Sequence, residues 1–145
     1  MSDRPAPPPP PSVDELQAII SGSPFHQFCQ VEVVSVDPQQ EIIAIRVPMR
    51  PEFERRAGTG QWHGGPIASL IDTAGDYALV FRTGGGVPTI NYRVDYLRPA
   101  MNTALTATAR LRRAGRTVGV VDIDVVDDQD RLVAVGRGCY SAQVG

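Results

Sequence analysis

At 145 residues the chain has the length of one ordinary domain, and its 42% hydrophobic and 21% charged residues are typical of globular proteins. A formal net charge of −2 gives no electrostatic reason to expect nucleic acid or an anionic membrane as a partner, so a small ligand is expected. All 14 basic residues are arginine, which excludes a lysine Schiff base and a lysine-bearing phosphate loop.

Cysteine and histidine are too few and too scattered to predict a metal site. Cys29 and Cys139 lack C-x-x-C spacing, and His26 and His63 add no cluster of ligands. We therefore expect no metal and no cofactor. No basic stretch followed by an apolar run begins the chain, and no segment approaches the roughly 20 apolar residues of a membrane span. We expect a soluble, cytoplasmic protein without a membrane partner.

Residues 1–12 are expected to form a disordered tail, because they contain five consecutive prolines, which lack N–H donors and favour an extended chain. A proline ligand for a partner domain is the alternative. Residues 13–145 are expected to form a single domain. Its first element is a short helix, because Ser12 and Glu15 have the spacing of a capping box and Gly22 follows the apolar residues. The runs QVEVVSV and EIIAIRV then predict a β-hairpin around the turn at residues 37–38.

A longer helix follows the motif QWHGGPIASLID at residues 61–72. Pro66 suits a first helical turn because it has no N–H to leave unpaired, and three glycines at residues 84–86 end the segment. The helix is expected to run from about residue 66 to about residue 81. Its apolar residues cover more than a narrow stripe, which predicts that other elements cover it on most sides.

Four β-like runs complete the chain, at residues 88–97, 103–113, 117–126 and 131–142. The order is therefore helix, two strands, long helix, four strands, without the strand–helix alternation of a parallel sheet. This order predicts an α+β fold in which a curled antiparallel sheet wraps around one long central helix.

The start of the long helix has the features of an oxyanion site. Gly64 and Gly65 lie where the first backbone N–H groups of a helix point outward, and without side chains they let a ligand atom come close. The positive end of the helix dipole favours a negative oxygen there. Such a site suits acyl transfer, in which a carbonyl oxygen gains negative charge.

Asp72 is the nearest acid on this helix. It lies 72 − 64 = 8 residues beyond Gly64, roughly 12 Å at about 1.5 Å per residue, which is too far for one carbonyl to contact both. Two copies packed antiparallel about a two-fold axis would bring Gly64 of one chain to Asp72 of the other. The alternative is that the motif only starts a helix and that Asp72 bonds locally or lies on an edge near Asp76.

The runs WHGGPIASLIDTAGDYAL and TINYRVDYLRPA closely resemble the hotdog-fold acyl-CoA thioesterases of the phenylacetate-pathway, PaaI-like type. The resemblance extends over roughly residues 30–143. It implies a hotdog fold, hydrolysis of an acyl- or aryl-CoA thioester to the free acid and coenzyme A, and a homodimer or a tetramer made of two dimers. Coenzyme A would be part of the substrate rather than a cofactor.

Matched position by position, the resemblance also implies residue roles. Asp72 would be the nucleophile or the general base for water, and the Gly64 N–H of the other subunit would polarise the thioester carbonyl. His63 would orient the loop or hold the substrate, with Gly65 beside it. Thr89 would help to position water or the acyl group. These roles are chemically sufficient, since a thioester needs a polarised carbonyl and an activated oxygen.

One position departs from the family pattern. Many members carry an asparagine six residues before the histidine, where this chain has Ala57. Gln61 is the nearest amide that could replace it. Arg98, Arg113 and Arg116 fall near strand ends, where the resemblance places contacts to the nucleotide of coenzyme A; their alternative is a solvated surface charge.

Two other functions fit the pattern less well. A non-catalytic acyl-CoA-binding or sensing module would explain Ala57 but not Asp72. A hotdog dehydratase would need a proline-rich histidine loop and a longer spacing from histidine to acid, and the sequence has neither.

Overall fold

The computed structural model describes residues 6–143. Its helices are α1 (Val13–Ile20), α2 (Pro24–Cys29), the 3-10 helix η1 (Pro51–Phe53), α3 (Gly64–Tyr77) and α4 (Val80–Thr83). Its strands are β1 (Glu32–Asp37), β2 (Ile42–Val47), β3 (Thr89–Tyr96), β4 (Leu105–Ala114), β5 (Val118–Asp127) and β6 (Leu132–Ser141). The expected tail lies partly outside the described residues, and residues 6–12 form neither helix nor strand.

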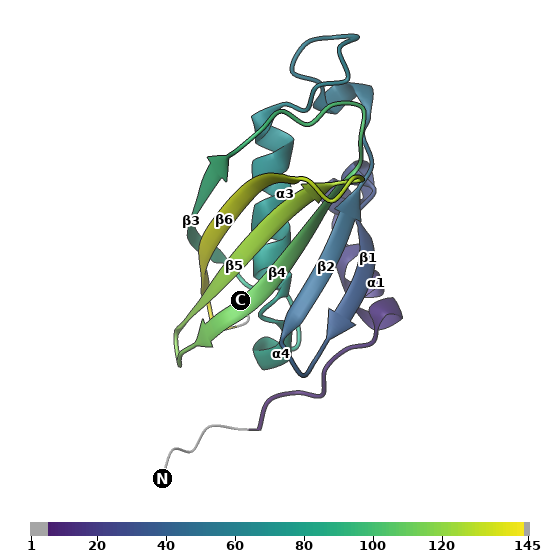
Figure 1. Cartoon of the computed structure of the whole chain (residues 1–145). Helices are drawn as coiled ribbons and strands as arrows, with labels where there is room; N and C mark the ends of the chain where they lie inside the picture. The colour runs from purple at the N-terminus through teal and green to yellow at the C-terminus, as the bar shows by residue number, and fades with distance from the viewer. Residues whose placement is uncertain (1–5, 144–145) are drawn as a thin grey trace.

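The strands form one antiparallel sheet in the order β1-β2-β4-β5-β6-β3. Figure 1 shows this sheet curving across α3, which lies behind it as a single long rod. The predicted α+β fold with a curled sheet around a central helix is therefore confirmed. Strands β1 and β3 are its two edges.

The core lies between α3 and the concave face of the sheet. Ile71 and Ala74 of the helix are fully buried against alternate residues of the strands. Tyr140 of β6 is also fully buried, and it fits because Gly75 and Gly138 lack side chains; a Cβ on either would lie within 2.2 Å of the tyrosine hydroxyl oxygen. The tyrosine hydroxyl reaches the backbone carbonyl of Asp72 at 3.4 Å. Sheet and helix are thus joined directly beneath Asp72.

The β1 edge of the sheet is covered. The Gln17 side chain of α1 accepts a hydrogen bond from the Val33 N–H at 2.7 Å and donates one to the Val31 carbonyl at 3.0 Å. The capping box that holds α1 is present as predicted, between Ser12 and Glu15. An edge strand whose first backbone groups are already bonded is a poorer template for another strand.

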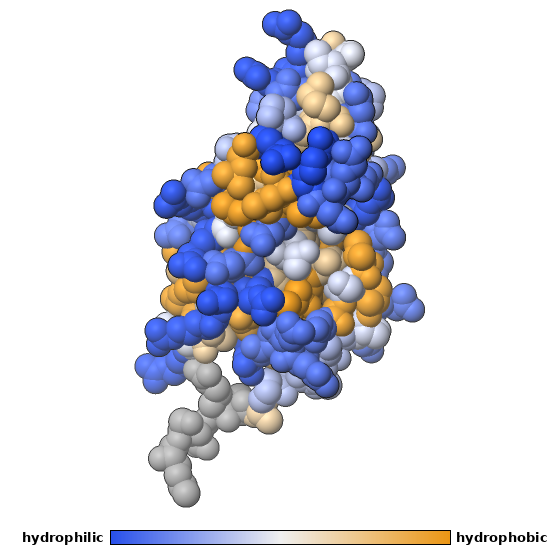
Figure 2. Space-filling model, viewed as in Figure 1, coloured by the Kyte–Doolittle hydropathy of each residue, from blue (hydrophilic) through white to orange (hydrophobic). Residues whose placement is uncertain are grey.

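The β3 edge is open. Its apolar side chains are exposed although they belong to a strand: Ile90 is 55% exposed, Tyr92 39% and Tyr96 53%, and the next residue, Leu97, is 53% exposed. The face of the molecule in Figure 2 is mostly hydrophilic and has several exposed hydrophobic patches. Exposed apolar residues along a strand whose outer edge is unpaired indicate a surface suited to contact.

Three local features differ from the expectation. The long helix starts at Gly64, two residues earlier than expected, because His63 caps it. It stops at Tyr77, and α4 follows as a separate short turn that ends at Gly84 in the left-handed conformation. Helix α2 is an element that the sequence reasoning did not predict, although Ser23 caps it and Pro24 occupies its first turn.

Candidate active site

The N-terminus of α3 is held open by its own cap. The His63 Nδ1 accepts a hydrogen bond from the Gly65 N–H at 2.9 Å, and the His63 N–H donates to the Phe53 carbonyl at 2.8 Å. Among residues 6–143, no acceptor takes the Gly64 N–H. The cap therefore uses Gly65 as a donor and leaves the Gly64 N–H available to a ligand at the positive end of the helix.

Tyr96 holds the other side of Gly64. Its hydroxyl donates to the Gly64 carbonyl at 2.7 Å, and a Cβ on Gly64 would lie 3.2 Å from the tyrosine ring. A side chain at this position would therefore push the tyrosine ring or the helix turn aside by a few tenths of an ångström. Tyr96 has no local signature of this role, since an aromatic residue in an alternating strand is usually part of the core.

The loop before the helix is fixed by Glu54, whose carboxylate accepts the N–H groups of Gly58 at 2.6 Å and Gly60 at 3.2 Å. Ala57, at the position of the usual asparagine, is exposed on this loop. Gln61 is partly buried beside it, and its backbone carbonyl accepts the Arg55 N–H at 2.8 Å. The role of Gln61 as a substitute amide remains a prediction.

Asp72 is half-buried two turns further along the helix. Its Oδ1 accepts a hydrogen bond from the Thr89 hydroxyl at 2.8 Å. Burial raises the pKa of the Asp72 carboxyl, and the bond from Thr89 offsets part of that rise. The helix thus presents a carboxylate whose basicity is increased by its surroundings and whose position is fixed by a hydroxyl.

Asp76 follows one turn later and shares this environment. Its Oδ1 accepts the Val87 N–H at 2.5 Å, which holds the segment that leads into β3 and therefore into Thr89. Burial, and next the neighbouring Asp72 charge, raise the pKa of Asp76 to about 6, while the bond from Val87 acts in the opposite direction. Two neighbouring carboxylates thus lie on one side of the helix.

Both parts of the predicted site contact β3, at its opposite ends. Thr89 at the start of the strand binds Asp72, and Tyr96 at its end binds Gly64. Within one chain the two parts are separated by the eight residues of helix between them, roughly 12 Å. A single chain therefore does not bring Gly64 and Asp72 to one substrate carbonyl.

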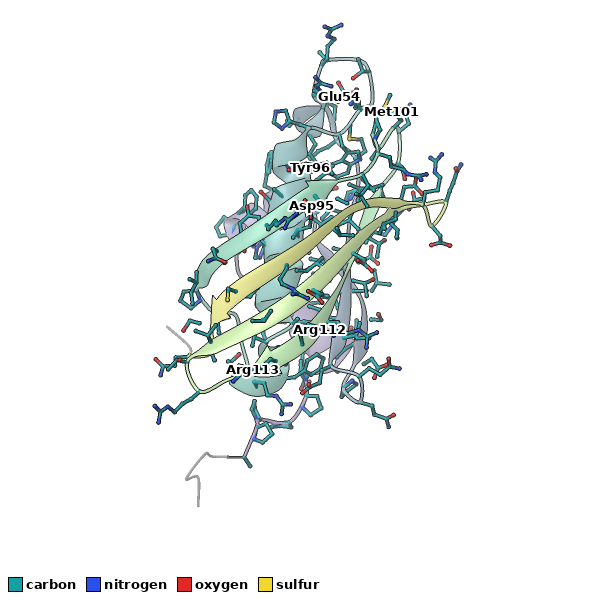
Figure 3. The ribbon with its side chains drawn as sticks, turned by 60° about the vertical axis from the view of Figure 1, so that its left-hand side comes forward. Glu54, Asp95, Tyr96, Met101, Arg112 and Arg113 are labelled. Carbon is teal, nitrogen blue, oxygen red and sulfur yellow. The ribbon has the colours of Figure 1, made fainter. Side chains whose placement is uncertain are left out.

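The three candidate arginines lie at two ends of the sheet. Arg98 follows the end of β3 near Tyr96, whereas Arg113 and Arg116 flank the β4–β5 turn. Figure 3 shows this separation, with Tyr96 near the end that carries Glu54 and Arg113 at the other end. All three arginines are exposed, and none forms an ion pair within residues 6–143.

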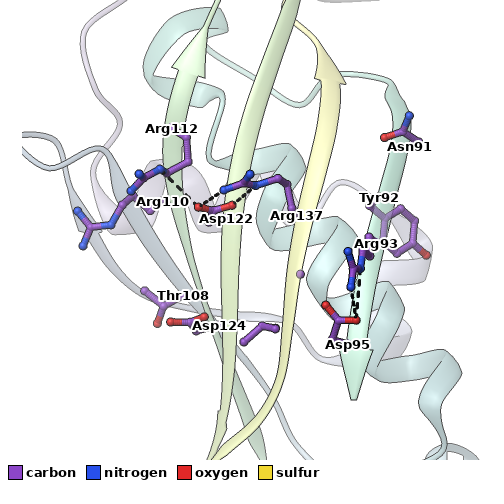
Figure 4. Close-up of a pocket in the computed structure, with 12 residues that line it drawn as sticks. Asn91, Tyr92, Arg93, Asp95, Thr108, Arg110, Arg112, Asp122, Asp124 and Arg137 are labelled. Atoms are coloured by element: carbon purple, nitrogen blue, oxygen red, sulfur yellow. Dashed lines mark hydrogen bonds and ion pairs between the residues drawn. The ribbon is translucent and has the colours of Figure 1, made fainter. Parts of the chain in front are cut away.

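The larger concave surface of the molecule, about 850 Å³, lies on the outer face of the sheet. Figure 4 shows its charges, where Asp122 lies between Arg137 at 2.6 Å and Arg112 at 3.4 Å. The bond from Arg137 lowers the pKa of Asp122, against a smaller effect of burial. This groove contains neither Gly64 nor Asp72, so its size does not make it the reaction site.

The described residues offer neither a metal site nor a membrane-spanning helix. In that part of the chain no group of three or more His, Cys, Asp or Glu side chains could hold a metal ion. No described helix has the length and apolar character needed to cross a bilayer.

A curled antiparallel sheet around one helix, with glycines at the helix start and an acid in its middle, defines a hotdog-fold protein. The sequence matches the Thioesterase superfamily over residues 59–134, and the chain belongs to that family. The resemblance proposed from the two sequence runs is therefore confirmed.

Individual relatives agree with this assignment. A protein of Halobacterium salinarum, 41% identical over 86% of this chain and 88% of its own length, has a provisional name as an esterase. The acyl-coenzyme A thioesterase PaaI of Escherichia coli K12 is 33% identical over 74% of each chain. Among solved structures, the E. coli PaaI protein from the phenylacetic acid degradation operon superposes with a TM-score of 0.75 at 28% identity, over 86% of this chain and 88% of that one.

Proposed function

We propose that the protein is an acyl-CoA thioesterase whose reaction site combines Asp72 of one subunit with the partner subunit's Gly64. The observation that carries the proposal is the position of both groups beside β3, Asp72 at Thr89 and Gly64 at Tyr96. The names of relatives such as PaaI support the substrate class.

The β3 edge supplies the means of assembly. If two copies pair β3 with β3 antiparallel about a two-fold axis, the Thr89 end of one strand lies beside the Tyr96 end of the other. Asp72 is then carried toward the partner subunit's Gly64, and a second identical site forms by symmetry. The exposed side chains of Ile90, Tyr92 and Tyr96 support this pairing, because the paired copy removes them from water.

The chemistry needs only these groups. The thioester carbonyl accepts a hydrogen bond from the Gly64 N–H, where the helix dipole stabilises the oxyanion that develops. Water activated by Asp72, or the Asp72 carboxylate itself, adds to the carbonyl carbon. Collapse of the tetrahedral intermediate breaks the carbon–sulfur bond, and coenzyme A leaves as the thiol after it takes up a proton. Where water attacks, the free acid forms in this step. Where Asp72 attacks, a water molecule then hydrolyses the mixed anhydride, which releases the acid and restores the carboxylate. Burial favours this role because it makes Asp72 a stronger base.

The same pairing supports a phosphate site for coenzyme A. Thr89 pairs with Tyr140, and Tyr140 pairs with Gly119, so the β4–β5 turn with Arg116 lies at the Thr89 end of the sheet. Antiparallel pairing brings the partner subunit's Arg98 to this same end. Arginine suits phosphate oxygens because its planar fork donates two hydrogen bonds.

A subunit-mixing experiment tests the composite site. Asp72→Asn and Gly64→Val proteins are each expected to be inactive, whereas their mixed dimers contain one site with both natural residues. Random exchange of subunits makes half of the dimers mixed with one intact site each, so about a quarter of the natural activity should return. Thiol release from acyl-CoA is the readout, and light scattering measures the assembly. No recovery in mixtures shown to contain mixed dimers would contradict the proposal.

A non-catalytic acyl-CoA-binding protein is the second candidate, favoured by the exposed Ala57 at the position where the family resemblance implies an asparagine. Binding of acyl-CoA without release of free thiol would decide for this alternative. Thiol release that depends on Asp72 would decide against it.

A further inference from the structure

A mostly apolar pocket of about 310 Å³ lies between α2, η1 and α3. Its floor consists of side chains that are each less than 9% exposed. These are Cys29, Val31, Val47, Phe53, Leu70 and Thr73. No charged side chain is among them, so a charged group at the floor would lose its hydration without gaining a partner.

The mouth of this pocket opens at the proposed reaction site. Gly65 and Pro66, in the first turn of α3, line its rim together with Ser69 one turn later. Gly65 directly follows the residue whose N–H is available for a carbonyl oxygen. A thioester carbonyl bound there can therefore direct its acyl substituent along α3 into the pocket.

The other side of the rim is formed by exposed residues of α2 and η1. Phe25 is 50% exposed, and the Glu52 carboxylate forms an ion pair with Arg50 at 3.0 Å. Arg50 also lies 4.0 Å from the centre of the Phe28 ring, which fixes this ion pair against α2. The only acidic group at the mouth is thus already paired.

Resting on the proposed thioesterase function, we infer that this pocket holds the acyl group and selects compact, uncharged acyl chains. Its volume is at the lower end of the roughly 300 to 1,000 Å³ found for ligand pockets, and its buried lining is free of charged side chains. A hexanoyl group is small enough for this volume, whereas a hexadecanoyl chain is larger than the space available. A succinyl group would bury its carboxylate against apolar side chains.

Cys29 on the pocket floor provides a reporter, and Cys139 on β6 provides an internal control in the same molecule. Cys139 is only partly buried and does not line the pocket. Burial raises the pKa of the Cys29 thiol, with a smaller opposite effect of Arg50, so alkylation should be measured at mildly alkaline pH. The modification rate of each cysteine by iodoacetamide is read by mass spectrometry of its peptide.

The Asp72→Asn protein should bind substrate without consuming it. Saturating hexanoyl-CoA is expected to slow the alkylation of Cys29 by about tenfold or more, with no change at Cys139. Acetyl-CoA carries the same nucleotide without the chain and should protect Cys29 much less. Equal protection by acetyl-CoA, or no protection by hexanoyl-CoA, would overturn the inference.

A floor substitution tests selectivity in the active protein. Cys29→Phe fills the pocket, and we expect it to lower kcat/KM for hexanoyl-CoA by roughly tenfold or more relative to acetyl-CoA. Cys139→Phe is the matched control and should leave this ratio unchanged. In the natural protein, hexanoyl-CoA should be hydrolysed more efficiently than succinyl-CoA or hexadecanoyl-CoA. Preference for either of the latter would overturn the inference.

The two proposals fail in different ways. If the natural protein releases no thiol from any acyl-CoA but Cys29 is still protected, the proposed hydrolysis fails and the pocket assignment stands. If hydrolysis depends on Asp72 but Cys29→Phe reduces hexanoyl-CoA and acetyl-CoA turnover equally, hydrolysis stands and the pocket assignment fails.

Discussion

The two halves of α3 differ in what they offer a ligand. The first half begins at Gly64, whose N–H is available at the exposed helix end because the His63 cap binds the Gly65 N–H. The second half presents Asp72 and Asp76, two partly buried carboxylates held from β3 and the segment before it. The partial positive charge of the helix start attracts negative groups, whereas the carboxylates of the second half are themselves negative. The same helix therefore holds complementary groups that are too far apart to act together within one chain.

This separation explains why the acid lies in the middle of an otherwise apolar helix. A carboxylate placed next to the helix start would neutralise the positive end that an oxyanion needs. Placed two turns away, it leaves that end free and becomes available to a second copy. Separate substitutions at the two ends of α3 test this division of roles.

Replacement of Asp72 by Asn should cause the largest loss. The amide keeps the shape and can still accept the bond from Thr89, but it cannot take a proton or attack a carbonyl. We expect kcat/KM for hexanoyl-CoA to fall by roughly 10² to 10⁴, the range typical of a general base. Asp124→Asn, at an exposed position of β5, is the control. Unchanged turnover in the Asp72→Asn protein would show that the Asp72 carboxylate has no part in the mechanism.

A methyl group at Gly64 should have the next largest effect. It would lie 3.2 Å from the Tyr96 ring, so either the tyrosine or the first turn must shift. A displaced oxyanion donor should lower kcat by roughly tenfold to a hundredfold. Gly85→Ala is the matched control, because nothing lies within 4 Å of its added atom. Equal effects of the two substitutions would show that Gly64 has no special role.

Thr89→Val should change the pH dependence more than the maximal rate. The Thr89 hydroxyl bonds to the charged carboxylate and so lowers the pKa of Asp72. Its loss should move the acidic limb of the kcat/KM profile to higher pH, with the largest decrease at low pH and recovery as the pH rises. Thr108→Val, exposed on β4, controls for the substitution itself. A decrease in kcat/KM that is the same at all pH values would contradict the expectation that Thr89 acts on the reaction through the pKa of Asp72.

Asp76→Asn should affect stability rather than turnover. The pKa of Asp76 is about 6 in the fold against an ordinary value of 3.8, so folding favours its protonated form. The contribution of the protonated Asp76 side chain to the free energy of unfolding is therefore fully present below pH 3.8. It is lost as the pH rises through about 6. Asn can still accept the Val87 N–H and carries no charge. Discounted for solvent screening, the variant should gain about 1 kcal/mol at pH 8 and nothing near pH 3.5, measured by urea unfolding.

A destabilised Asp76→Asn protein at pH 8 would indicate that the charged form is needed to hold the segment before β3. The control is again Asp124→Asn, whose stability should follow that of the natural protein across the same pH range.

Much of the fold follows from local patterns in the sequence. The alternation of the strands, the Ser12–Glu15 cap and the apolar breadth of the central helix are local features, and the structure contains each of them. Helix α2 was missed because its six residues are too few for a periodic pattern to stand out. The end of α3 was placed too late because the apolar residues continue past Tyr77 into α4.

The site was less predictable than the fold. Gly64 and Asp72 were identified from spacing and from the family resemblance, but the contacts that hold them come from β3, which is remote in sequence. Neither the bond from Tyr96 to Gly64 nor that from Val87 to Asp76 has a local signature. The apolar pocket has no local signature either, because its buried lining combines side chains of α2, β2, η1 and α3.

The hydrogen bonds of Gln17 to the β1 edge have a consequence for how far assembly can go. A sheet with two open edges can add copies at both sides without limit and grow into a filament. Gln17 occupies backbone groups at the start of β1, which hinders strand addition on that side and leaves β3 as the more available edge. In the proposed dimer, a single amide side chain would thereby favour a closed pair over an extending sheet.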